Sequence, residues 1–255
     1  MIKDLYKYRE LLKSNVKKEI RGKYKGSFLG VLWSFFNPLL QVAVYAIVFP
    51  YIMRIKTDNY LQYLIVGIIP WTFFTTVINQ GMITVRMNAG IIKKVYFPRE
   101  ILPISVALSG LINFFISCII ILLFCVFGGL GISWHLLLLP FIAIIQFFLT
   151  LGLVFALSAI NIYIKDTEYI VQFIINMLFY GTPILYTATL FPTTVRWILY
   201  LNPLTELVDF YRDIFMYHQM PQLHHFIYLV VVTGFVYVIG RLIFKKLEKG
   251  FAEEV

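Results

Sequence analysis

Six long apolar runs constrain this chain more than any other feature. They lie near Phe28–Met53, Leu61–Val85, Ile101–Phe127, Leu136–Tyr163, Tyr169–Leu190 and Phe226–Phe244. Each provides the roughly 20 residues that a helix needs to cross about 30 Å of hydrocarbon. Inside hydrocarbon the backbone must satisfy its own hydrogen bonds, so runs of this length predict helices. We expect an all-α integral membrane protein with six transmembrane helices in one domain, 1–255.

Charge is scarce and lies at the ends of the apolar runs. Hydrophobic residues make up 60% of the sequence and charged residues 14%, far outside the range of soluble domains. The net charge of +9 raises the question of nucleic-acid binding. Positive residues that bound apolar runs instead fix topology and contact anionic headgroups. The sequence therefore predicts membrane lipids as partners and no nucleic acid.

The distribution of Lys and Arg predicts the orientation. With six crossings and a cytoplasmic N-terminus, 18 of the 22 Lys and Arg residues fall in cytoplasmic segments and 4 fall outside. Membrane proteins carry an excess of these residues on the cytoplasmic side. Both termini are therefore expected in the cytoplasm.

Two segments outside the spans have the pattern of amphipathic helices. In 1–27, apolar residues recur every three to four positions and lysines occupy most of the other face, which predicts a helix lying at the membrane interface. In 191–222, Asn202-Pro203 separates two short helical patterns, Thr194–Leu201 and Leu204–Tyr217. These two helices either re-enter the outer leaflet, where protein must bury their backbone, or lie on the outer surface.

The segment 86–100, RMNAGIIKKVYFPRE, is an island of charge between two apolar runs. It holds four basic residues and one acid, which places it in the cytoplasm. Its apolar residues Ile91, Ile92, Val95 and Tyr96 provide a face for a partner protein.

The middle of each span contains no Asp, Glu, Lys, Arg or His. Ion-coupled carriers and membrane enzymes usually need such groups, so both classes are disfavoured. The chain also has no G-x-x-x-x-G-K-[ST] phosphate loop. If it performs vectorial work, another subunit must supply the energy.

Uncharged polar residues do occur within the spans. Each either lines a path for sugar hydroxyls or makes a hydrogen bond between helices, and the sequence leaves both readings open. They are Asn37, Gln41, Asn79, Gln80, Asn113, Gln146, Asn161, Gln172 and Asn176.

Taken in order, a set of segments resembles the membrane subunit of type-2 ABC exporters, in the group that exports polysaccharides and polyol phosphates such as O-antigen or teichoic acid. They are YKGSFLGVLWSFFNPLL (24–40), GIIPWTFF (67–74), KKVYFPREILP (93–103), NIYIKDTEY (161–169), TPILY (182–186) and NPLTELVDFYRD (202–213). The resemblance implies a bacterial cytoplasmic-membrane protein that pairs with a second copy of itself and two ATP-binding cassette subunits. The cargo would be a glycan attached to undecaprenyl diphosphate. The chain itself would not be an enzyme and would hold no metal or cofactor, since ATP and Mg belong to the partner.

The resemblance also implies roles for particular residues. Segment 86–100 would be the coupling helix that the ATPase moves, through Asn88, Ile91, Ile92, Lys93, Lys94, Val95 and Tyr96. Arg21, Lys23 and Lys25 would contact the lipid diphosphate, or else ordinary anionic lipid. Candidate channel-lining residues are Trp33, Phe36, Asn37, Gln41, Tyr45, Asn176, Tyr180 and Tyr186. The outer gate would include Trp197, Tyr200, Asn202, Pro203, Tyr211 and Arg212. The first and fifth spans, kinked at Pro38 and Pro183, would separate at the dimer interface.

Several alternatives remain at this point. One is an ABC exporter of lipids or drugs. Another is a membrane enzyme acting on polyprenyl-linked sugars, which would need acids such as Asp166 and Glu168, or Glu206, Asp209 and Asp213. An ion-coupled carrier or a membrane scaffold is the third.

Overall fold

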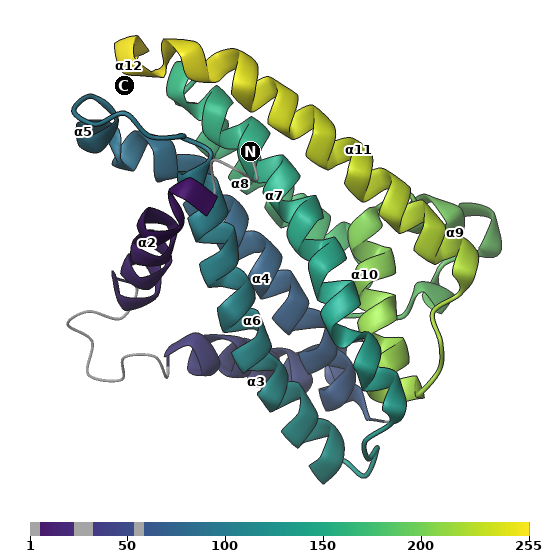
Figure 1. Cartoon of the computed structure of the whole chain (residues 1–255). Helices are drawn as coiled ribbons and strands as arrows, with labels where there is room; N and C mark the ends of the chain where they lie inside the picture. Colours follow the sequence, from purple (N-terminus) through teal and green to yellow (C-terminus); the bar gives the residue numbers. More distant parts are fainter. Residues whose placement is uncertain (1–5, 23–32, 54–58, 255) are drawn as a thin grey trace.

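The computed structural model describes residues 6–22, 33–53 and 59–254, and this part of the chain is built from helices without strands (Figure 1). Four helical stretches in it are long and apolar enough to cross a membrane. They are Tyr60–Met87 (α4), Ile101–Phe127 (α6), Trp134–Tyr163 (η2, Trp134–Leu138, continued by α7, Leu139–Tyr163) and Leu223–Gly250 (α11, Leu223–Leu247, continued by η5, Glu248–Gly250). These stretches confirm four of the predicted spans and the all-α membrane class.

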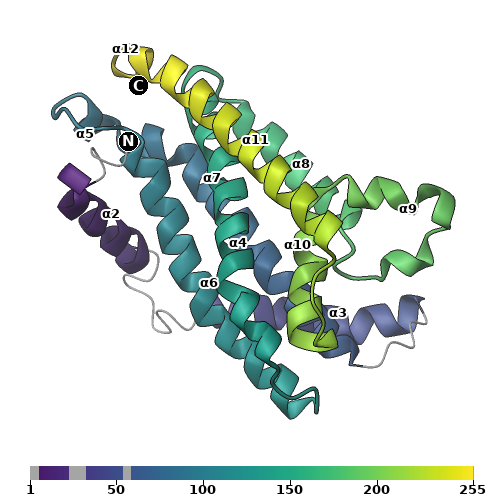
Figure 2. The same cartoon turned by 45° about the vertical axis from the view of Figure 1, so that its right-hand side comes forward.

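The first and fifth predicted spans differ from expectation. α3 (Trp33–Met53) has 21 residues, but Figures 1 and 2 show it running across the long helices rather than beside them. α8 (Thr167–Gly181) has 15 residues, about 22 Å, which is shorter than the hydrocarbon core. The predicted helix Tyr169–Leu190 is therefore wrong in extent, and Pro183 lies beyond the helix end instead of kinking it. A proline disfavours helical backbone in the residue before it, and Thr182 is extended (φ −108°, ψ 131°).

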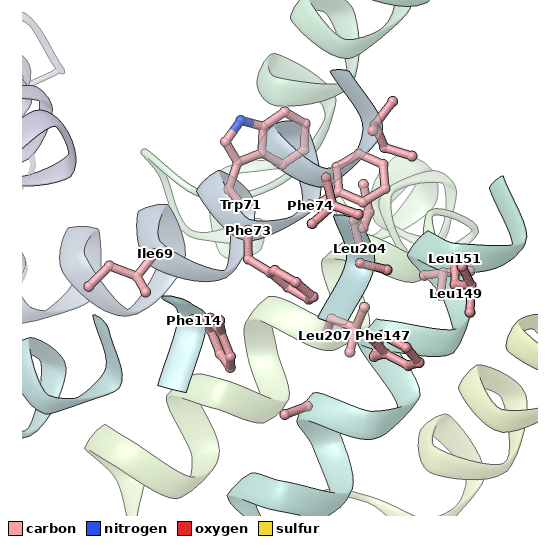
Figure 3. Close-up of a cluster of buried hydrophobic side chains, with 14 of the residues drawn as sticks. Ile69, Trp71, Phe73, Phe74, Phe114, Phe147, Leu149, Leu151, Leu204 and Leu207 are labelled. Carbon is pink, nitrogen blue, oxygen red and sulfur yellow. The ribbon is translucent and has the colours of Figure 1, made fainter. Parts of the chain in front are cut away.

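α4 lies at the centre of the bundle, with α6 and α7 packed against it. Most of its side chains are buried along its whole length. Figure 3 shows part of this hydrophobic core, where Phe73 of α4 lies beside Phe114 of α6, and the two ring centroids are 5.3 Å apart. Offset aromatic pairs of this kind add about 0.5–1.5 kcal/mol beyond the area that they bury. The core therefore fixes α4 and α6 relative to each other.

α7 and α11 approach closely because glycines meet at their contact. A methyl group at Gly240 would collide with the carbonyl oxygen of Gly152. Small residues allow such close backbone approach between membrane helices, where packing replaces the hydrophobic effect as the driving force. Phe155 and Phe244 pack one turn further along, with ring centroids 5.3 Å apart.

Short helices gather at one end of the bundle. Figures 1 and 2 place α5 (Ala89–Ile92) and α12 (Phe251–Glu254) at the same end of the bundle, opposite the C-terminal end of α6. α2 (Arg9–Gly22) packs on α6. It confirms a helix within the predicted N-terminal segment, of which 1–5 and 23–27 lie outside the described residues.

Two short helices precede α11 and confirm the helical patterns predicted in 191–222. They are α9 (Thr193–Tyr200) and α10 (Pro203–Arg212), and a single π-helical turn, η4 (Asp213–Tyr217), continues α10. The side chain of Asn202 accepts a hydrogen bond from the Leu204 backbone N–H, which caps α10. α10 packs against α4, α7 and α11, whereas α9 buries none of its residues. The two helices are therefore not alike: α10 belongs to the core and α9 to the surface.

Candidate functional site

The chain between α4 and α6 presents several exposed side chains. We call residues 88–96 the docking segment. It begins at Asn88, which is buried. The amide of Asn88 donates to the Thr84 carbonyl (2.7 Å), and its oxygen accepts from the Lys18 ammonium of α2 (3.1 Å). Asn88 therefore ties the start of the docking segment to both α4 and α2.

Three apolar side chains of the docking segment face outward: Ile91, Val95 and Tyr96, which is 91% exposed. Lys93 and Lys94 are exposed beside them. Ile92, which was predicted on the same face, is 6% exposed and packs into the core. An exposed aromatic ring among aliphatic and basic side chains suits a protein interface better than a surface left in water.

Ion pairs join both ends of the docking segment to other helices. Before it, Arg86 pairs with Glu168 in the first turn of α8. Asn161 also donates to the Glu168 carboxylate (3.2 Å). After it, Arg241 of α11 donates to the Glu100 carboxylate (3.1 Å). α8 and α11 are therefore in direct contact with the residues just before and just after the docking segment.

A groove of about 410 Å³ lies between α2 and α6. Its lining combines apolar and basic residues, and comprises Leu12, Lys13, Val16, Lys17, Ile20, Arg21, Leu108 and Ile112. Lys13, Lys17 and Arg21 are spaced four residues apart and so share one helix face. Arg21 is the part of the predicted diphosphate cluster that the structure describes, because Lys23 and Lys25 lie outside the described residues.

The predicted channel-lining residues of α3 fall into different settings. Trp33 and Asn37 line a cavity with α4 and α6. Gln41 donates to the Tyr45 hydroxyl (3.2 Å), and Phe36 is 42% exposed. The Tyr45 ring also lies 6.0 Å from that of Phe179, so α3 contacts α8 at this point.

The candidates at and after α8 lie mainly on its exposed side. Asn176 accepts a weak hydrogen bond from Gln172 (3.5 Å), and Tyr180 is 64% exposed. The Tyr186 hydroxyl donates to the Tyr180 carbonyl (2.7 Å). The structure thus gives α3 and α8 exposed faces with polar and aromatic groups, and their place in a channel stays a prediction.

The stretch after α8, 182–186, is held by side chains from other helices rather than by helical hydrogen bonds. The contacts are Tyr60 Oη to Leu185 O (2.9 Å), Tyr63 Oη to Tyr186 O (2.7 Å), Arg212 Nη2 to Ile184 O (3.1 Å) and Asn202 Nδ2 to Thr182 Oγ1 (2.9 Å). Non-helical backbone within a membrane protein needs such partners because lipid offers none.

Arg212 is a deeply buried charged residue and is 2% exposed, as is Glu206. Its guanidinium lies 3.5 Å from the centroid of the Tyr63 ring and 3.3 Å from an Asp209 carboxylate oxygen. Gly67 leaves the space, since a Cβ atom there would lie 3.2 Å from Nη2. The planar fork thus stacks on a ring, pairs with an acid and binds a carbonyl at once, as guanidinium geometry allows.

An acidic hollow of about 290 Å³ lies beside Arg212, between α10 and the start of α11. Glu206 lies 2.6 Å from the His225 ring nitrogen Nδ1. Glu206 belongs to α10, which lies outside the four helical stretches that are long enough to cross a membrane. Burial, together with the charges of Asp209 and Asp213, raises the pKa of Glu206 to about 7. Among the described residues no group of three or more His, Cys, Asp or Glu has the arrangement of a metal site.

The predicted outer-gate residues divide between surface and core. Trp197 is 59% exposed, whereas Tyr211 is fully buried and its hydroxyl donates to Gln146 of α7 (2.8 Å). Tyr200 lines the acidic hollow. Asn202 and Pro203 form the start of α10.

Sequence reasoning did not predict the pairs Arg86–Glu168, Arg212–Tyr63 or Glu206–His225. The available signal was a charged residue beside an apolar stretch, which requires a partner wherever the fold buries it. That signal identifies the residue but not its partner, because the partners come from other helices.

The fold and these surfaces define a class of protein: an integral membrane subunit whose long helices carry no charge in their middle, with an exposed basic segment suited to a second protein. Residues 10–216 match the family model described as ABC-2 type transporter. The chain belongs to this family.

The chain is also similar to known proteins over nearly its whole length. The chain is 34% identical to the O-antigen export system permease protein RfbA of Myxococcus xanthus, covering 100% of this chain and 99% of the relative. It is 35% identical to a protein of the same name from Klebsiella pneumoniae, covering 96% and 94%. It is 22% identical to the polysialic acid transport protein KpsM of Escherichia coli, covering 91% of each.

Proposed function

We propose that this chain is the membrane subunit of an ATP-driven exporter that carries a polysaccharide across the bacterial cytoplasmic membrane. The observation that carries the proposal is the similarity, over the whole length, to O-antigen export permeases. The cargo is a glycan linked to a lipid, in the proposed case undecaprenyl diphosphate. The alternative cargo is a polyol-phosphate polymer such as teichoic acid, because the family resemblance covers exporters of both kinds of polymer.

The energy enters through the docking segment. Two ATP-binding cassette subunits, each holding ATP and Mg, press on Ile91, Val95 and Tyr96 of two copies of this chain. The Arg86–Glu168 pair then carries the movement to α8. The exposed faces of α3 and α8 meet those of the second copy and form the channel, with both termini in the cytoplasm.

The groove between α2 and α6 receives the lipid carrier before export. Its apolar lining residues suit a polyprenyl chain, and Lys13, Lys17 and Arg21 supply positive charge for a diphosphate. Ordinary anionic lipid would use the same chemistry, so a competition experiment must distinguish the two.

Export by the reconstituted pair tests the proposal. This chain is co-expressed with a candidate ATP-binding cassette protein from the same genome, and the purified pair is placed in inverted vesicles with lipid-linked glycan from the host. We expect ATP-dependent accumulation of glycan in the lumen. Absence of accumulation with an ATPase-active wild-type pair would contradict the proposed cargo.

A pair of matched variants tests the docking segment. Tyr96→Asp places a charge on the proposed interface and is expected to reduce ATPase co-purification more than tenfold, as loss of an aromatic hot spot does. Ile132→Asp serves as the control, because Ile132 is 71% exposed but lies in the loop after α6, at the opposite end. Equal co-purification by the two variants would show that the docking segment is not the interface.

A further inference from the structure

The polar residues inside the long helices separate into two groups. Gln146 is 1% exposed, donates to the Pro70 carbonyl (2.9 Å) and accepts from the Tyr211 hydroxyl (2.8 Å). Asn161 is also fully buried and donates to the Met82 carbonyl (3.3 Å). These two amides hold helices together.

A second group faces a cavity instead. The cavity has a volume of about 440 Å³ and lies between α3, α4 and α6. Asn79 and Gln80 of α4, Asn113 of α6 and Asn37 of α3 line it. Within the part of the chain that the structure describes, the side chains of these four residues make no hydrogen bond.

The cavity places polar side chains inside helices that are long enough to cross a membrane. Asn113 lies near the middle of α6, and Asn79 lies two turns before the end of α4. A primary amide carries two donor hydrogens and an acceptor oxygen, and leaving these groups without partners away from water is costly. The cavity is therefore built for contents that form hydrogen bonds.

The other lining groups restrict what those contents are. Phe73 and Phe114, seen beside each other in Figure 3, contribute aromatic rings, and Thr76 and Ser117 contribute hydroxyls. Among the described residues, none that lines the cavity is charged. A phosphate group would have no counter-charge at this depth, whereas an uncharged ligand with many hydroxyls finds donors, acceptors and apolar ring faces together.

We infer that this cavity binds a neutral, hydroxyl-rich unit of the cargo, a sugar ring, as a site separate from the basic groove that suits the diphosphate. The volume falls within the range of small-ligand pockets. The inference rests on the proposed function, because it takes the exported glycan as the source of the sugar. The cargo would then be recognised at two places: its diphosphate at the basic residues of α2, and a sugar ring in the uncharged cavity within the bundle.

Export by paired variants tests this site. Asn79→Leu combined with Asn113→Leu removes two amides at nearly constant volume and is expected to lower export roughly tenfold or more, from about one lost hydrogen bond each. ATP hydrolysis and the unfolding temperature stay near wild type. Ser109→Ala is the matched control, since Ser109 lies one turn from Asn113 and donates to its own helix at the Val106 carbonyl.

Failure of the inference and failure of the proposed function are distinguishable. If the wild-type pair does not export glycan, the proposed function fails. If the wild-type pair exports and the double variant exports equally well, the cavity does not bind the cargo. If the double variant also loses ATPase coupling or unfolds early, Asn113→Gln is used: it keeps the amide, so retained export supports the site and an equal loss counts against it.

Thiol protection tests occupancy directly. Asn113→Cys is made in a chain with Cys118→Ala and Cys125→Ala, and N-ethylmaleimide labelling of the complex is followed with and without glycan released from its lipid by mild acid. We expect labelling that slows at least about fivefold with glycan and not with undecaprenyl phosphate, as partial occupancy of one site predicts. Protection by the lipid alone, or absence of any labelling, overturns the inference.

Discussion

Replacement of Arg212 is expected to destabilise the chain more than replacement of any exposed arginine. The guanidinium is 2% exposed and contacts the Tyr63 ring, the Asp209 carboxylate and the Ile184 carbonyl. Arg212→Ala removes all three contacts. It also leaves a carboxylate and a buried carbonyl without their partner.

The expected magnitude follows from these contacts. Removing one member of a buried ion pair costs about 3–5 kcal/mol. Asp209 keeps 31% of its side chain exposed, so water recovers part of this loss. We therefore expect Arg212→Ala to lower the free energy of unfolding by about 3–4 kcal/mol. Arg212→Lys keeps the charge but loses the planar stack on Tyr63, and a loss of about 2 kcal/mol is expected.

Equilibrium unfolding of the purified chain in detergent micelles, followed by tryptophan fluorescence, measures these differences. Arg196→Ala is the control, because Arg196 is partly exposed on α9 and binds carbonyls of its own loop, with an expected cost of about 1 kcal/mol. The expected order of stability is wild type, Arg196→Ala, Arg212→Lys, Arg212→Ala. A value for Arg212→Ala within about 1 kcal/mol of wild type, or no difference between Lys and Arg at this position, would refute the reasoning.

Three further changes test other contacts. Gly240→Ala places a methyl group against the backbone of α7 and should lower the unfolding free energy by about 2 kcal/mol or more, whereas Gly234→Ala, which meets open space, should not; equal stability would show that α7 and α11 pack less closely. Arg86→Glu and Glu168→Arg should each lower ATP-driven export, and the double exchange should restore part of it. The pair is about one-third exposed, so its coupling in stability is only about 1 kcal/mol, and export without any restoration would contradict its role in transmission. The folded pKa of Glu206 is about 7, above its ordinary 4.5, so the folded chain holds a proton that the unfolded chain releases, and stability should fall as pH rises from 4.5 through 7. Glu206→Gln should flatten this dependence, and a wild-type unfolding temperature that is already constant over this range would contradict the assignment.

Local and periodic features of the sequence predicted much of the fold. Four of the six predicted spans are confirmed as long apolar helices, because length and hydropathy alone decide that property. Asn202-Pro203 predicted the start of α10 because the cap uses only neighbouring residues. The end of α8 had a local signal in Pro183, but the apolar run continues past it and led to a helix that is too long.

Contacts between distant segments were beyond prediction from one sequence. The partner of Arg212 on α4 depends on how α10 packs, and no local pattern encodes that placement. Ile92 is buried whereas Tyr96 is exposed, and this difference depends on how the single helical turn α5 is oriented against the core. The grouping of Asn79 and Asn113 around one cavity likewise required the packing of α4 on α6.

The stretch after α8 has a consequence for how this part of the chain can move. Its carbonyl groups at Ile184, Leu185 and Tyr186 are held by side chains of α4 and α10 rather than by the next turn of a helix. Each bond that is broken in a lipid surrounding leaves an uncompensated carbonyl, so partial release is costly and release of all of them together with a new set of partners is favoured. Residues 182–186 are therefore expected to move together or not at all, and the hydroxyls of Tyr60 and Tyr63 on α4 help to hold them in place.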